Sequence, residues 1–92
     1  MKVTQVESKT RKTYTVKIED GEVVECKWAR TDRRFRVQRV TVVKEDGNVN
    51  SVSIAGPVLK KDGTDSRNWA DERLYGEKEW PTWLTPIIRG LA

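Results

Sequence analysis

Positively charged residues gather in two stretches of the sequence. Residues 27–39, KWARTDRRFRVQR, contain six basic residues and one acid, which gives this stretch a net charge of +5. Residues 59–69, LKKDGTDSRNW, contain three more basic residues. Arginine binds phosphate through a fork of hydrogen bonds, and lysine binds it as a point charge. The two stretches therefore indicate binding of an anionic ligand, either a nucleotide or a nucleic-acid backbone.

Each stretch contributes one candidate binding cluster. Lys27, Arg34 and Arg36 point away from the apolar faces of two predicted strands, so they form a positive patch if those polar faces coincide. The second cluster contains two lysines, an arginine and a tryptophan that could stack on a base: Lys60, Lys61, Arg67 and Trp69. We expect the first cluster to suit nucleic acid and the second a small nucleotide, with one of them as the main surface. The alternative interpretation of the arginines is a solvated sheet face with cross-strand ion pairs.

Four tryptophans in so short a chain suggest a second kind of contact. Trp28 and Trp83 lie among apolar residues and are expected in the core. Trp69 and Trp80 lie in polar segments, and tryptophan is one of the residue types that dominate binding hot spots. They support an alternative function, a protein–protein inhibitor or adaptor that uses a loop expected at residues 62–80. Alternatively, both rings cover a small core from the loop side.

Catalytic residue types are scarce. The chain has no histidine, and its one cysteine, Cys26, falls at a core position of a predicted strand without an imidazole to activate it. Glu72, Glu77 and Glu79 lie in a polar stretch and are expected on the solvated surface. No glycine-rich phosphate loop is present. We therefore expect a binding protein without catalytic activity, cofactor or metal.

Length and composition indicate one domain, residues 1–92, with a basic arm at residues 1–12. Apolar residues make up 36% of the chain, so the core is small and a homodimer would bury more surface. No apolar run is long enough to span a membrane, and the N-terminus lacks the apolar centre of a secretory signal. The single cysteine favours a reducing compartment, so we expect a cytoplasmic protein.

Two nine-residue segments, TVKIEDGEV (15–23) and TVVKEDGNV (41–49), match at six positions and indicate two similar hairpins. A two-residue Asp20-Gly21 loop would place Glu25 opposite Val16. We therefore predict three-residue loops at 19–21 and 45–47, with Gly21 and Gly47 in the left-handed region. These loops pair apolar positions within each hairpin: Val16 with Val24, and Val40 with Val52.

Four strands follow from the alternation of apolar and polar residues: 13–19, 22–30, 34–44 and 49–60. The apolar parity changes within the third strand, which predicts a bulge near residues 38–39, and residues 56–57 indicate an edge or bend in the fourth. Residues 62–80 are expected to be mostly loop, with a short strand at 73–75. The apolar spacing after Trp80 predicts a C-terminal helix. The predicted fold class is α+β: an antiparallel meander of about four strands with this helix on one face. A small β-barrel is the alternative.

The segments GPVLKKDGT (56–64) and EWPTWL (79–84) carry a resemblance to known sequences. They resemble a group of small proteins from actinobacteria and their phages, in which a hairpin leads to an LKKDGT-like turn and then to a P-x-W-L helix start. The resemblance covers about the C-terminal half of the chain. It implies a cytoplasmic, phage-type accessory protein that acts by binding. No activity is attached to that group, so no site residues carry over.

Overall fold

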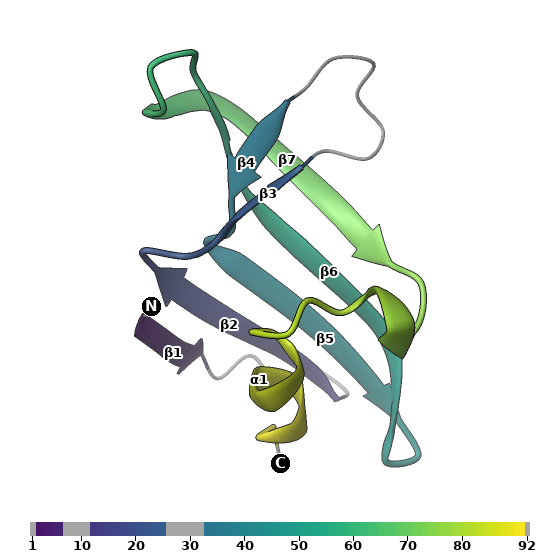
Figure 1. Ribbon diagram of the computed structural model, residues 1–92. Helices are drawn as coiled ribbons and strands as arrows, with labels where there is room; N and C mark the ends of the chain where they lie inside the picture. The colour runs from purple at the N-terminus through teal and green to yellow at the C-terminus, as the bar shows by residue number, and fades with distance from the viewer. Residues whose placement is uncertain (1, 7–11, 26–32, 92) are drawn as a thin grey trace.

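The computed structural model describes residues 2–6, 12–25 and 33–91 (Figure 1). This part of the chain forms seven strands: β1 (Lys2–Val6), β2 (Thr13–Glu19), β3 (Val23–Glu25), β4 (Arg34–Arg36), β5 (Arg39–Glu45), β6 (Asn48–Leu59) and β7 (Asp65–Leu74). A 3-10 turn, η1 (Glu77–Glu79), and a five-residue helix, α1 (Thr85–Arg89), follow the last strand. No helix in the described part of the chain is long and apolar enough to cross a membrane.

The strands form one antiparallel sheet in the order β1-β2-β5-β6-β4-β3, and β7 pairs with β6 outside this path. The long strand β6 organises the sheet. On one edge it pairs with β5 through Ala55 and then with β4 at Val58, while β7 occupies its other edge. Among the described strands this order does not close on itself, so the sheet is open (Figure 1).

The predicted α+β fold class is wrong, and so is the alternative barrel. The fold is an open, mostly antiparallel sheet, and α1 is too short to form a helical layer. Pro86 lies in the first turn of α1, and the residues before it form a separate turn in which Leu84 N donates to Pro81 O. Proline blocks continuation of a helix through that point. The apolar spacing that predicted a C-terminal helix therefore spans this turn and the short α1.

Residues 65–74 form β7, which corrects the prediction of a loop at 62–80. The strand alternates buried Ala70, Glu72 and Leu74 with exposed residues. Glu72 is only 5% exposed, so its predicted place on the solvated surface is also wrong. A carboxylate in the middle of the buried face hides the period-two pattern, because sequence reasoning treats an acid as a surface residue.

The first predicted hairpin does not form, because β2 pairs with β1 and β5 instead of β3. Val16 therefore lies opposite Val40, not Val24. Gly21 does not have positive φ; the preceding Asp20 does, at 52°. What requires glycine is a close approach of two backbones: a Cβ at Gly21 would lie 2.0 Å from the carbonyl oxygen of Val37.

The second predicted hairpin forms between β5 and β6, but with a two-residue loop. Asp46 and Gly47 have φ of 52° and 80°, the pattern of a type I′ turn, so the predicted left-handed Gly47 is confirmed and the three-residue loop is wrong. The register shifts after Val43, and Val40 pairs with Ile54 instead of Val52. This β-bulge keeps the apolar residues of β5 and β6 on the same face of the sheet. The prediction had used a three-residue loop for that purpose.

The predicted irregularity near residues 38–39 is confirmed, because the chain leaves β4 at Arg36 and re-enters the sheet as β5 at Arg39. Gln38 N donates to Ala55 O at 2.8 Å. Pro57 is an internal position of the sheet, paired with Trp69 at the place where β6 passes from β5 to β4. Its missing N–H falls between those two partners, which explains how a central strand tolerates proline.

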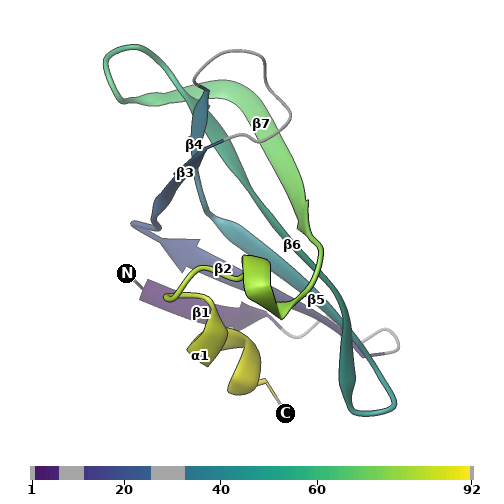
Figure 2. The same ribbon diagram turned by 45° about the vertical axis from the view of Figure 1, so that its right-hand side comes forward.

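The core lies between one face of the sheet and the C-terminal segment (Figure 2). Val16, Val40 and Ile54 form a row across β2, β5 and β6 on this face. Three residues of the C-terminal segment cover it and are themselves buried: Leu84, Ile88 and Leu91. Lys44 Nζ donates to Leu91 O at 2.7 Å and so holds the end of the segment against β5. The opposite face is called here the outer face. On it a second row of residues runs across β2, β5, β6 and β7: Lys17, Arg39, Ala55 and Asp71.

Candidate anion-binding site

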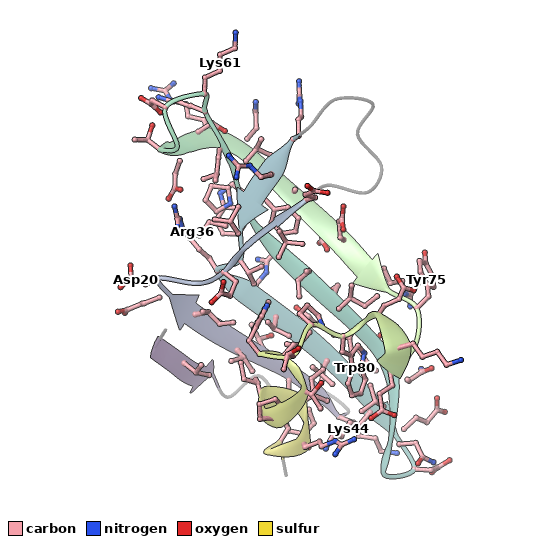
Figure 3. All side chains as sticks on the ribbon, viewed as in Figure 1. Asp20, Arg36, Lys44, Lys61, Tyr75 and Trp80 are labelled. Carbon is pink, nitrogen blue, oxygen red and sulfur yellow. The ribbon has the colours of Figure 1, made fainter. Side chains whose placement is uncertain are left out.

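A pocket of about 430 Å³ lies between the β6–β7 turn and the start of β4. Its lining includes four cationic residues from two separate parts of the chain: Arg33, Arg34, Lys60 and Lys61. Ser66 and Asn68 of β7 add a hydroxyl and an amide, and Val58 and Leu59 supply apolar surface. None of the described residues in the lining is acidic. We call this site the basic pocket; Figure 3 shows Lys61 at the turn between β6 and β7.

The β6–β7 turn positions the two lysines. Gly63 N donates to Lys60 O at 2.9 Å, Lys60 N donates to Thr64 O at 2.7 Å, and Gly63 has φ of 86°. These are the features of a three-residue loop closed by a glycine bulge. The geometry predicted for the first two Asp-Gly turns therefore occurs at the third, where it presents Lys60 and Lys61 at the tip of two long strands.

One carboxylate, that of Asp62, lies in the same turn. Its Oδ1 accepts hydrogen bonds from Thr64 Oγ1 at 2.6 Å and from Thr64 N at 3.0 Å. The hydroxyl bond first, and the backbone bond second, lower the pKa of Asp62 below its ordinary value. The carboxylate therefore stays ionised and committed to Thr64, and it is not part of the basic pocket's lining.

Packing of Phe35 positions the arginines. Phe35 is completely buried and pairs with Val58 of β6, which brings the start of β4 beside the end of β6. Arg34 precedes Phe35 and lines the pocket. Arg36, on the other side of Phe35, is instead engaged by Asp65, with its Nε 3.5 Å from Oδ1. Gln38 also reaches Asp65, at 3.4 Å, so Asp65 neutralises Arg36 outside the pocket.

The remaining predicted site residues are dispersed. Lys27 lies outside the described residues. Arg67 and Trp69 are exposed on β7. Trp69 lines a second pocket, of about 700 Å³, together with Lys17, Arg39 and residues at the end of β2, and the Arg39 guanidinium lies 5.6 Å from its ring centroid. Trp80 packs against the core (labelled in Figure 3).

The structure thus joins members of the two clusters that sequence analysis treated as alternatives. Arg34 from the first and Lys60 and Lys61 from the second share the basic pocket. Arg33 was not among the predicted site residues, because it lies outside the predicted strand at 34–44. In the structure it lies just before β4 begins. Asn68 was missed because residues 65–74 were not expected to form a strand.

Among the described residues, no group of three or more histidine, cysteine or acidic side chains could hold a metal ion. No family model matches the chain, and neither a curated protein nor a solved structure matches it. The geometry and charge of the basic pocket are therefore the features that point to a function.

Proposed function

We propose that the protein is a non-catalytic module that binds the phosphate groups of nucleic acid in the basic pocket. The observation that carries this proposal is the convergence of four cationic residues without an acid in the described lining. Two arginines offer forked hydrogen bonds to phosphate oxygens, and two lysines offer point charges. Glu25 lies directly opposite Arg34 across β3 and β4, but it is not part of the described lining. Two other acids are engaged elsewhere, since Thr64 holds Asp62 and Arg36 lies beside Asp65.

A nucleic-acid backbone suits this pocket better than a free nucleotide. A nucleotide site needs a surface for the base, and the described lining contains no aromatic side chain. The predicted stacking residue, Trp69, lines the other pocket and already has Arg39 over its ring. Phosphates spaced along a nucleic-acid backbone can instead contact both the lysines of the β6–β7 turn and the arginines at the start of β4.

Salt-dependent binding of labelled oligonucleotides tests the proposal. We expect the affinity for duplex DNA to fall with salt with a log–log slope of about −0.9 for each phosphate neutralised. Arg34→Glu and Lys61→Glu should each weaken binding and reduce that slope, because each removes a phosphate contact and adds repulsion.

The matched control is Lys78→Glu, which makes the same change in net charge at an exposed residue of η1. It should affect binding much less than the two pocket variants. Competition with a nucleoside triphosphate distinguishes a nucleic-acid site from a nucleotide site. If the pocket were a nucleotide site, a low concentration of the triphosphate would block oligonucleotide binding. Equal losses for Lys61→Glu and Lys78→Glu would mean that net charge, not this pocket, causes binding.

A second candidate function, a protein–protein inhibitor or adaptor, draws support from Trp69. Trp69 is 52% exposed on the outer face, although residues 65–74 form a strand and not the predicted loop. An aromatic-anchored interface should respond weakly to salt. Binding that Trp69→Ala abolishes and Lys61→Glu leaves unchanged would favour this function over nucleic-acid binding.

A further inference from the structure

Strand β7 is a long edge strand of the sheet formed by the described residues. It spans ten residues, and among the described residues it pairs only with β6. Both views show it along one margin of the molecule (Figure 1, Figure 2). A strand at an edge presents unpaired N–H and C=O groups, which are a template for pairing with another strand.

In the regularly paired part of β7, from Trp69 to Leu74, the backbone groups that face outward belong to the odd-numbered residues. Ala55 O accepts from Gln38 N, so the backbone groups of Ala55 point toward β5. Orientation alternates along a strand, so Ile54 and Gly56 point toward β7, where they lie opposite Glu72 and Ala70. The N–H and C=O groups of the residues between these, Trp69, Asp71 and Arg73, therefore point away from β6.

The odd-numbered residues of β7 form a self-complementary charge pattern: Asp65, Arg67, Trp69, Asp71 and Arg73. Asp65 and Trp69 lie opposite Leu59 and Pro57 of β6. Ser66 and Asn68 line the basic pocket with Val58, so Arg67 between them falls on the outer face, although β7 has two extra residues in this stretch. Reversing the direction about Trp69 exchanges each acid with a base. We propose that a second copy of this chain pairs with β7 in antiparallel orientation, with the two-fold axis at Trp69.

In this register each charged residue lies opposite its complement. Arg67 lies opposite Asp71 of the other copy on both sides of the axis, and Asp65 lies opposite Arg73. Directly opposite residues share a face of the sheet, so opposite charges stabilise the pairing and like charges destabilise it. The two tryptophans meet at the centre, where aromatic pairs contribute to cross-strand stability.

Neighbouring registers are disfavoured. A shift that keeps the outer faces aligned can centre the axis on Ala70, which places Arg67 opposite Arg73. Centring it on Asn68 places Asp65 opposite Asp71. Larger shifts place Asp71 or Arg67 opposite itself. The charges therefore select the register centred on Trp69.

Two features of β7 oppose indiscriminate pairing and make the partner specific. The edge is charged, and residues 66–68 form an irregularity where Asn68 N bonds Ser66 Oγ at 3.2 Å and the register with β6 shifts. Both devices protect edge strands from random association. Asp65 is also engaged by Arg36, so the two Arg67–Asp71 pairs beside the axis carry most of the selectivity.

A charge-exchange experiment tests the dimer. Arg67→Asp alone and Asp71→Arg alone place like charges opposite each other in both pairs, and each variant should be monomeric. The double variant Arg67→Asp/Asp71→Arg restores opposite charges and should dimerise again. An equimolar mixture of the two single variants should form a heterodimer, because each then supplies the complement of the other. Sedimentation velocity distinguishes the 10.6 kDa chain from a species of twice that mass.

Circular dichroism of every variant checks that the sheet is retained, since both residues are exposed. The proposal is overturned if the wild type stays monomeric up to millimolar concentration, or if either single variant dimerises as the wild type does. A mixture that remains monomeric would also overturn it. Lys61→Glu, which alters the basic pocket, should leave dimerisation unchanged, so this inference stands or falls independently of nucleic-acid binding.

Discussion

Close backbone approach, rather than left-handed conformation, explains the glycine at position 21. A Cβ there would lie 2.0 Å from Val37 O, a backbone atom that cannot rotate away, whereas the space around Gly47 is open. Gly21→Ala should therefore lower the free energy of unfolding by about 3 kcal/mol, the upper end for overpacking. Gly47→Ala should lower it by about 1 kcal/mol, the cost of left-handed strain. Urea denaturation measures both, and equal losses would contradict the assignment.

The hydrogen bonds of Asp62 make a prediction about pH at the same scale. Because Thr64 lowers the pKa of Asp62 in the folded protein, the contribution of this carboxylate to stability is present above its unfolded pKa. That contribution is lost as the pH falls through the folded pKa. Thr64→Val removes the hydroxyl, the larger cause, and should return the Asp62 pKa toward its ordinary value. Carboxyl NMR titration measures this; an unchanged pKa would show that the hydroxyl bond is absent.

At the scale of elements, the same Asp-Gly motif adopts three different backbone conformations in three turns. At residues 20–21 only the aspartate has positive φ, at 46–47 both residues do, and at 62–63 only the glycine does. The difference follows from the strands on either side. The first turn leads into a strand that pairs elsewhere, the second needs the twist of a two-residue hairpin, and the third closes a bulged loop.

Helix α1 depends on its packing, because five residues are too few for a helix to be stable by itself. Ile88 is 1% exposed in the core, whereas the neighbouring Ile87 is only partly buried against it. Ile88→Ala should lower the free energy of unfolding by about 2–5 kcal/mol. Ile87→Ala, the matched control, should cost clearly less. Denaturant unfolding measures the difference, and similar losses would mean that α1 does not dock through Ile88.

At the scale of the whole molecule, the proposed binding surfaces lie on an open sheet. The C-terminal segment covers one face, while the outer face, the β7 edge and the basic pocket are not covered by it. The basic pocket depends on a long-range contact, since the pairing of Phe35 with Val58 brings Arg33 and Arg34, at the start of β4, to the lysines of the β6–β7 turn. The sequence shows that these residues are basic, but their spacing along the chain does not predict that they lie close together in the fold.

The sequence by itself determined the local properties of the chain. Its alternating valines predicted strands that exist, at 13–19 and within 34–44 and 49–60; its parity change predicted the break near residue 38; and its composition located the positive charge. Only the tertiary structure decided which strands are neighbours. The period-two pattern assigns a residue to a face but does not say which strand lies beside it, so the pairing of β1 with β2 and the formation of β7 were not visible. Glu72 and the two bulges show why: buried polar groups and extra residues are tolerated only where a specific partner strand accommodates them.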